Sequence, residues 1–465
     1  MSTPVKIRTA AAVAVAVTGC LAAVIAVALG ALGGQFQAMG GLDESAVDSA
    51  TGLYYSVNDM DAQVGNVLLV GNNRALASDR SQDISIYATD RGTANTELTQ
   101  TMAIEADNSA VQRQLRSALD GLGQFQALSA DALLTDQQTR MPVGRTPAPA
   151  ASYYQQSTGL MQASILPVVS SLTDISAARL DDTYTGGRST ARTATVATIA
   201  VGAALVIILV ALQLYLSARF RRRVSPALAA ATLVALALAI TGWTRLTAES
   251  GNMYLAKVEA FDSVIALTQA RATSFDANAD ETRYIVALGD PAQAAKYQQS
   301  FLAKSQLICD VGSNVGIFGY DAALAARIDA YDRDSSVPVP FGGDLGAEFD
   351  NITFPGERAA ATATLLAYQV YERDDRVLRK MVKTNLPGAV AYDIGTAADQ
   401  SDGAFNSYIA ALNSVIGINQ AYFARAARAG QNEAAGWNAA YPAAAAVLIV
   451  ALVLIGVRPR LAEYR

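Results

Sequence analysis

Apolar residues gather into four long runs along the chain, and polar segments of very different length separate them. Each run lacks charged residues and comes close to or exceeds the roughly 20 residues that a helix needs to cross a bilayer. The predicted membrane spans are residues 9–33, 194–217, 226–243 and 440–457. Because residues 218–225 alone join the second span to the third, this short turn and both chain ends are expected on one side of the membrane.

The two long polar segments, residues 34–193 and 244–438, have the patterns of helices rather than strands. In the second, apolar and small residues recur in alternating steps of four and three along 254–286 and again along 405–426, which is typical of long helices packed in a bundle. We expect helices at 42–70, 82–104, 107–130, 153–184, 292–312, 321–332 and 357–385 as well. Gly186 and Gly187 are expected to loosen or kink the chain before the second span.

These elements predict an all-α membrane protein with four transmembrane helices and two extracytoplasmic helical bundles, 34–193 and 244–438. Each half repeats the order span, bundle, span. Two short similarities accompany the repeat, because Val67–Asn72 resembles Ile285–Asp290 and Tyr154–Ser157 resembles Tyr297–Ser300. We therefore expect an internal duplication.

Charge sets the predicted orientation. The short segments 1–8, 218–225 and 458–465 are rich in arginine and lysine, whereas the whole chain carries a formal net charge of −6. Basic residues beside membrane spans stay in the cytoplasm. The prediction is a multi-pass protein of the cell membrane with cytoplasmic N- and C-termini, whose two long segments lie outside.

The first span, which contains Cys20, has three interpretations. It is an uncleaved anchor, a lipoprotein signal processed at Cys20, or a cleaved leader. The apolar run continues past Cys20 to Leu32, longer than the 7–15 residues of a signal core, and this favours the anchor.

The residue inventory argues against catalysis. The chain has no histidine, which is the commonest general base and zinc ligand. Its two cysteines, Cys20 and Cys309, fall in a span and in an outer segment and are not expected to pair. With no phosphate-binding glycine loop and no metal-ligand spacing, we predict no catalytic, cofactor-binding or metal-binding residues, no enzyme activity and no nucleic-acid partner.

Two surfaces are candidates for binding. The predicted cytoplasmic docking residues are Arg219, Arg221, Arg222, Arg223, Arg458, Arg460, Tyr464 and Arg465. Fixing the topology is a sufficient alternative role for the arginines, and anionic membrane lipid is another ligand for them. The second surface is the long loop 333–357, where exposed Phe341, Phe349 and Phe354 would bind an extracytoplasmic partner; disorder and internal packing are the alternatives.

Charged and polar residues on the long helices of the second segment offer weaker signals. Arg271 and Arg283 lie near Asp276, Asp280 and Glu281, and surface ion pairing is the favoured interpretation, with a carboxylate-binding site as the alternative. Polar residues in the helix seam would suit a pair of helices that shifts on binding, although an ordinary alanine-rich bundle explains them too.

Three patches carry a family resemblance: Ser217–Thr232, Tyr297–Ser305 and Gly456–Arg465. Through them the chain resembles the four-span membrane sensors of actinobacteria of the GlnX type. The resemblance implies a relay in which an extracytoplasmic solute-binding lipoprotein senses acidic amino acids and a cytoplasmic serine/threonine kinase of the PknG type responds.

The short cytoplasmic segments agree with a relay, since about 25 residues are too few to fold an effector domain. Any message must then pass to another protein. The expected function is a non-enzymatic transmembrane sensor or adaptor for a nutrient signal, possible as a homo-oligomer; the alternative is a structural or transporter-accessory protein of the cell envelope.

Overall fold

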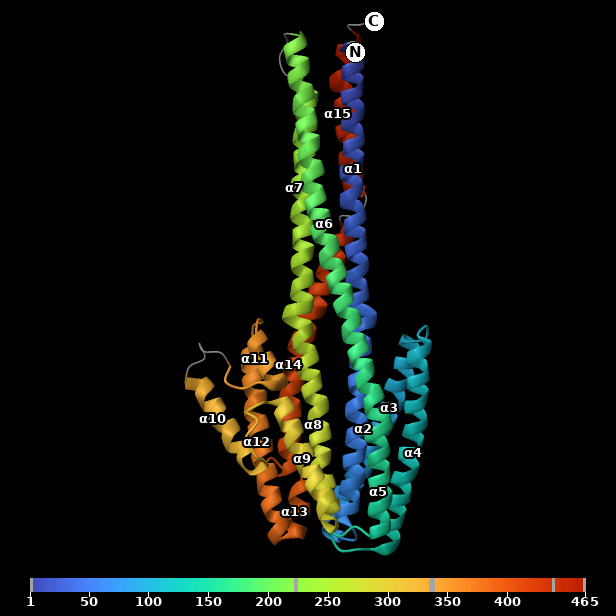
Figure 1. The fold of residues 1–465 in the computed structure, drawn as a ribbon, viewed down its shortest axis with the longest axis vertical. Coiled ribbons are helices and arrows are strands. Elements are labelled where there is room, and N and C mark those ends of the chain that lie inside the picture. The colour runs from blue at the N-terminus through green and yellow to red at the C-terminus, as the bar shows by residue number, and fades with distance from the viewer. Residues whose placement is uncertain (1–2, 221–224, 334–338, 437–439, 463–465) are drawn as a thin grey trace. The chain divides into compact units, whose positions relative to one another are not determined.

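The computed structural model describes residues 3–220, 225–333, 339–436 and 440–462. Within these ranges the chain is helical almost throughout (Figure 1), and the extended pairing consists of one isolated bridge between Asp310 and Gly342. Four helical runs are long and apolar enough to cross a membrane: Pro4–Gly41, Ala148–Arg219, Pro226–Gly289 and Ala440–Leu461. The prediction of an all-α, multi-pass membrane protein is confirmed.

The helices follow one another along the chain with short connections. They are α1 (Thr3–Ala38), α2 (Glu44–Val70), α3 (Ala77–Ile104), α4 (Ser109–Thr139), α5 (Ala148–Leu160), α6 (Leu166–Phe220), α7 (Pro226–Tyr254), α8 (Asp262–Val286), α9 (Pro291–Ile308), α10 (Tyr320–Arg333), α11 (Gly343–Asn351), α12 (Glu357–Thr384), α13 (Leu386–Asp393), α14 (Ser401–Gly436) and α15 (Ala440–Ala462). Three π-helical turns interrupt them: η1 (Met39–Asp43), η3 (Met161–Ile165) and η4 (Leu255–Phe261).

Local signals explain several helix ends. The Asp290 carboxylate caps α9 by accepting hydrogen bonds from the backbone N–H groups of Ala292 (3.0 Å) and Gln293 (3.3 Å), and Pro291 occupies the first helical position. Asn108 caps α4 in the same way. Gly71 ends α2 in the left-handed region, with φ of 56°, where a side chain would be strained.

The chain divides into two compact units. One unit takes its described residues from Met1–Gly41, Arg179–Lys257 and Phe423–Arg465 and is called the membrane unit because it contains the apolar runs. The other takes its own from Leu42–Ala178 and Val258–Tyr422 and is called the outer unit after the side of the membrane that the sequence predicts for it. Both long polar segments thus contribute to one outer unit, where the sequence pattern predicted two bundles. The pattern shows that each helix has a buried face but not which helix covers it.

Small residues bring the helices of the membrane unit close together. A Cβ atom at Gly202 of α6 would lie 2.6 Å from the Cβ of Ala239 in α7, and one at Gly242 of α7 would lie 2.6 Å from Ile25 Cδ1 in α1. Close backbone approach at small residues is the usual way in which membrane helices associate.

No break interrupts the chain at Gly186 and Gly187, because α6 is continuous from Leu166 to Phe220. Close packing explains the glycine at position 187 instead. A Cβ there would lie 2.3 Å from Met253 Cε and 2.7 Å from Gln35 Oε1, so the glycine makes room for neighbouring side chains of the membrane unit.

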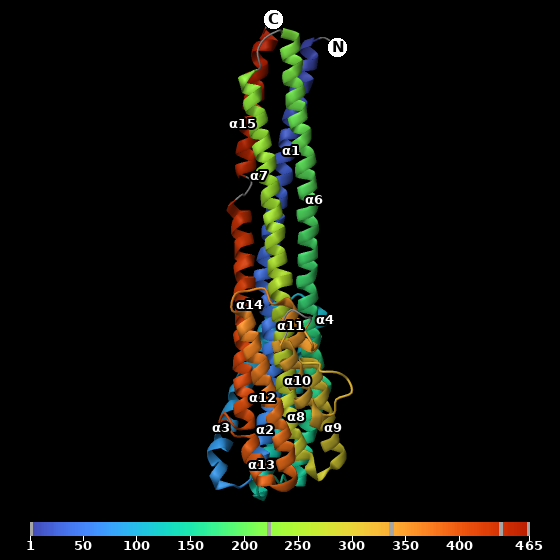
Figure 2. The ribbon, with the colours of Figure 1, turned by 90° about the vertical axis from the view of Figure 1, so that its left-hand side faces the viewer.

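The outer unit contains several apolar clusters. One is formed by residues of α2, α3, α4 and the start of α6. A larger one is formed by residues of α8 to α12 and α14, and Figure 2 shows these helices from the side that faces the viewer. A third joins the two segments, since Leu69 and Val70 of α2 pack with Tyr284 and Ile285 of α8 and with Tyr297 of α9. The stretches that resemble each other in sequence therefore meet in this third cluster, where α2 and α8 lie side by side.

Candidate functional site

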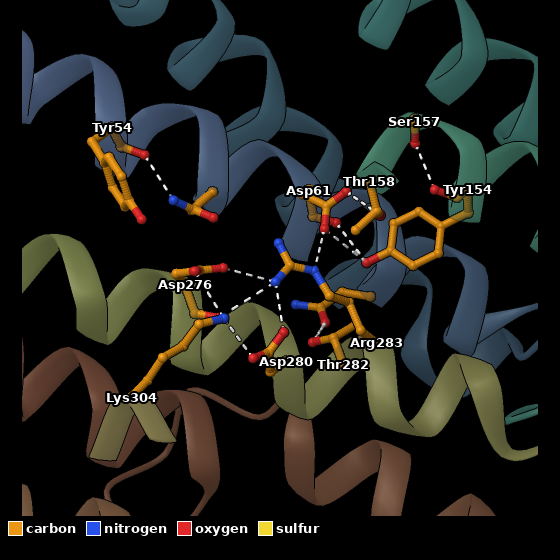
Figure 3. A network of polar contacts seen from close by, with 12 residues as sticks. Tyr54, Asp61, Tyr154, Ser157, Thr158, Asp276, Asp280, Thr282, Arg283 and Lys304 are labelled. Carbon is orange, nitrogen blue, oxygen red and sulfur yellow. Dashed lines mark hydrogen bonds and ion pairs between the residues drawn. The ribbon is translucent and has the colours of Figure 1, made fainter. Parts of the chain in front are cut away.

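The side chain of Arg283 lies at the centre of a charge network in the outer unit (Figure 3) and is fully buried. Its Nε atom contacts Asp61 Oδ2 of α2 at 2.7 Å. Its Nη1 atom contacts Asp276 Oδ1 at 2.8 Å and Asp280 Oδ1 at 2.7 Å, both one turn or two before it on α8. Arg283 thus pairs with three aspartates, which lie on two helices. Arg283 and Asp61, which join these helices, are 222 residues apart in the sequence.

Further helices complete the network. Lys304 of α9 contacts Asp276 Oδ2 at 2.8 Å and Asp280 Oδ2 at 2.5 Å. On the other side, Asp61 Oδ1 accepts a hydrogen bond of 2.7 Å from the Thr158 hydroxyl of α5. The Tyr154 hydroxyl, also on α5, donates to the backbone carbonyl of Asp61 at 3.2 Å. Four helices, two from each long segment, are therefore joined by charge-assisted contacts.

The opposite charges within the network counteract the effect of burial. Burial opposes the charge of Arg283, but Asp61, Asp280 and Asp276 outweigh burial and raise its pKa well above the ordinary value. Burial would likewise raise the pKa of Asp276, yet Lys304 and Arg283 bring that pKa below its usual range. At Asp61, burial has the larger effect and raises the pKa, although Arg283, Thr158 and Tyr154 oppose it.

The same helices touch closely beside the network. A Cβ atom at Gly65 of α2 would lie 2.4 Å from Thr282 Cγ2 of α8 and 2.9 Å from the Tyr154 hydroxyl. The Thr282 hydroxyl donates to Asn66 Oδ1 at 3.0 Å. The crossing of α2 over α8 is therefore fixed by shape as well as by charge.

Buried ion pairs are poor stabilisers but good determinants of register. Removing one partner of such a pair costs about 3–5 kcal/mol, whereas apolar residues of the same volume often serve stability equally well. A network of this kind therefore defines one discrete arrangement of α2 against α8. A shift of either helix must break several contacts at once.

A second group of buried charges lies on α12. Arg376 pairs with Glu372 and Asp375, and Arg379 Nε donates to Asp375 Oδ2 at 2.9 Å. The guanidinium of Arg379 also lies over the ring of Tyr284 in α8, with its carbon 4.7 Å from the ring centre. This group holds α12 to α8 within the outer unit.

The expectation for Arg283 was wrong. Surface ion pairing was favoured from the sequence, but its side chain has no exposed surface. Asp276, Asp280 and Arg283 follow steps of four and three, which places them on one helix face and was the available signal. Asp61, Tyr154 and Lys304 were not singled out, because no local pattern distinguishes them from surface residues.

Arg271, by contrast, is partly exposed. Its Nη1 donates to Asn413 Oδ1 at 3.1 Å, and its guanidinium lies over the Tyr55 ring.

The predicted extracytoplasmic loop differs from expectation, because α11 occupies Gly343–Asn351. Phe341, Phe349 and Phe354 are 6%, 5% and 7% exposed, so the premise of exposed rings is wrong. Phe341 and Phe349 pack edge to face at 5.3 Å, and Phe354 stacks on Tyr422 at 4.0 Å. Packing of the rings into the outer core excludes them as a surface, and partner binding by this segment stays a prediction.

Of the predicted cytoplasmic docking residues, three are described. Arg219 is exposed near the end of α6, and Arg458 and Arg460 lie on the last turns of α15. Arg458 and Arg8 line a cavity of about 910 Å³ between α15 and α1, whose other walls are apolar. Arg221, Arg222, Arg223, Tyr464 and Arg465 lie outside the described residues. Docking at these positions stays a prediction.

Comparison with known families adds one finding. Residues 35–185 match the family model of the actinobacterial sensor domain. This segment is similar to a sensor domain. The matched residues include α2 to α5, and so they supply Asp61, Tyr154 and Thr158 to the charge network. No curated protein and no solved structure matches the chain significantly.

The sensor-domain match supports part of the sequence interpretation. It supports an actinobacterial sensor protein with a sensing role. It falls on the first long segment, whereas the resemblance noted from the sequence rested on patches outside that segment.

Proposed function

We propose that this protein is a non-enzymatic transmembrane sensor that passes a change in its outer unit to a cytoplasmic partner. The observation that carries the proposal is the buried network around Arg283. It joins α2 and α5 of the sensor-like segment to α8 and α9 of the second segment. Along the chain, α2 follows the first predicted span and α8 follows the third.

The network suits a relay because its ion pairs are either formed or broken, which gives two distinct arrangements of the helices. Helix shifts of about 1–2 Å are a common switching motion in signalling proteins. A shift of that size would lengthen the 2.7 Å contact between Arg283 and Asp61 beyond hydrogen-bonding range. The ion pairs therefore hold the resting arrangement until an outer ligand or partner stabilises another one.

The proposed partners follow the resemblance. An extracytoplasmic solute-binding lipoprotein would present an amino-acid signal to the outer unit, and a cytoplasmic serine/threonine kinase would receive it at the arginine-rich turn and the C-terminal tail. In this proposal both chain ends lie in the cytoplasm, which agrees with the basic residues beside the predicted spans. Anionic lipid around these arginines, and pairing with a second copy, are compatible with the same arrangement.

The proposal predicts that weakening one arm of the network changes signalling. Asp61→Asn removes the charge that faces Arg283 Nε while keeping the size of the side chain. We expect kinase-substrate phosphorylation in cells to change several-fold at an equal amount of protein in the membrane. Asp120→Asn, on the exposed face of α4, is the matched control and should leave phosphorylation unchanged.

The outcome that contradicts the proposal is equally direct. Affinity purification of the full chain from membranes should recover a kinase and an outer binding protein. If neither is recovered, and a strain without this protein shows altered uptake or envelope integrity with normal phosphorylation, the protein is a transporter-accessory or structural component instead.

A further inference from the structure

A cavity of about 250 Å³ lies within the outer unit, apart from the Arg283 network. Residues of five helices line it, contributed by α2 and α6 from the first segment and by α8, α9 and α11 from the second. Its volume suits a small metabolite rather than a peptide.

The lining of this cavity is polar and rich in hydrogen-bond acceptors. Hydroxyl groups come from Tyr54, Thr173 and Thr273, among others, and an amide comes from Gln269. Carboxylates come from Asp174 of α6 and Asp344 of α11, and no lysine or arginine is among the lining residues. Such a lining attracts a positive charge and repels an anion.

Asp344 adds an independent observation. Its side chain is half-buried, and burial raises its pKa to about 7, with no cation opposing the effect. Asp61, Asp276 and Asp280 each face Arg283, whereas Asp344 has no such partner among the described residues. Asp344 therefore exchanges its proton near neutral pH, and a bound ammonium group would favour the ionised carboxylate.

We propose that this cavity binds a small cationic amine, whose ammonium group lies against Asp344 and Asp174 and whose remaining donors reach the surrounding hydroxyl groups. A neutral polyol would satisfy the hydroxyls but would give neither carboxyl group a cationic partner. An acidic ligand would add a third negative charge to the site. The inference rests on the proposed sensor function and names a ligand class for it.

The cavity is connected to the charge network through Tyr54 of α2. Figure 3 draws Tyr54 together with the network. Burial raises the pKa of the Tyr54 phenol, Asp276 and Asp280 raise it further, and Arg283 lowers it. A ligand in the cavity would contact α2 and α8 together, the same two helices that Arg283 joins. Its binding energy would therefore act directly on their register.

The ligand class also separates this site from the signal that the resemblance implies. Acidic amino acids would be excluded by the two carboxylates and would reach this protein only through a binding lipoprotein. An amine would bind the outer unit directly.

The test uses the full-length protein in lipid nanodiscs and isothermal titration calorimetry at pH 7.5. The probes are 1,4-diaminobutane as the cation, sorbitol as the neutral polyol and glutarate as the anion. We expect saturable binding of 1,4-diaminobutane and no binding of glutarate. Asp344→Asn should weaken the binding of 1,4-diaminobutane at least tenfold, and Asp350→Asn, exposed on the same helix, should leave it unchanged.

Three outcomes would overturn the inference: no binding of 1,4-diaminobutane by the wild type, equal binding of glutarate, or full binding by Asp344→Asn. Circular dichroism of each variant checks that it folds, and Thr273→Val provides a second, uncharged change in the lining that should also weaken binding. Binding that leaves kinase-substrate phosphorylation unaltered would contradict the proposed function and leave the amine site intact, so the two failures are distinguishable.

Discussion

Asp83 and Asp90 lie on the buried face of α3, where they are 5% and 8% exposed. Burial raises the pKa of each to about 8. Nearby carboxylates add to the effect, from Asp402 and Asp79 for Asp83 and from Asp59 for Asp90, and Arg80 opposes it only at Asp83. Asp59 of α2 and Asp90 also share a hydrogen bond, so one proton serves two carboxyl groups.

These two residues predict that the protein is more stable in mild acid. An unfolded chain releases aspartate protons near pH 4, whereas the folded chain holds these protons up to about pH 8. The free energy of unfolding therefore falls as pH rises from about 4 to 8. We expect a higher midpoint of thermal unfolding at pH 6 than at pH 8, measured by circular dichroism in detergent.

The control for this prediction replaces the titrating groups. The double variant Asp83→Asn, Asp90→Asn should show a smaller difference between pH 6 and pH 8 than the wild type. Asp120→Asn, whose carboxylate is exposed, should keep the full difference. An unchanged difference in the double variant would show that other groups are responsible.

At the scale of elements, the helices were largely predictable and their partners were not. The periodicity along 254–286 and 405–426 anticipated α8 and α14, because a buried helix face repeats every 3.6 residues. The short helices α11 and α13 were missed, since eight or nine residues hold too few turns for a periodic signal. Nothing in the periodicity could relate Asp61 to Arg283.

Close packing of α6 on α7 supplies a prediction at this scale. Gly202→Leu would place a side chain where the Ala239 Cβ leaves no room, so we expect destabilisation by about 1–3 kcal/mol. Gly19→Leu on α1 is the matched control, because no atom lies within 4 Å of the position of its Cβ. Thermal unfolding of both variants in detergent measures the difference, and equal stability would show that α6 and α7 separate without cost.

At the scale of the whole molecule, the two long polar segments both contribute to a single outer unit. The segments 34–193 and 244–438 can share this unit only if they lie on the same side of the membrane, and the buried contact of Arg283 with Asp61 requires it. The sequence could suggest a repeat, but it could not reveal the contact between the two long segments.

This shared side is testable by cysteine labelling in intact cells. Asp120→Cys and Asp329→Cys, both at exposed positions of the outer unit, should react with a membrane-impermeant maleimide. Ser225→Cys, beside the arginine-rich turn, should react only after lysis. The native thiols add little background, since Cys309 is buried and Cys20 belongs to the first span. Labelling of only one of the two outer positions would contradict the arrangement.

The π-helical turns η1 and η4 lie where the chain passes from one compact unit to the other. A π-helical turn accommodates one residue more than an α-helical turn, and each residue of an α-helix advances the azimuth by about 100°. If either turn relaxed to regular α-helix, the helical residues that follow it would therefore rotate about the helix axis by about 100°. Deleting one residue from Met39–Asp43 would instead remove the extra residue and keep the flanking helices in phase, so the variant would have a regular α-helix there and no π-helical turn left to relax.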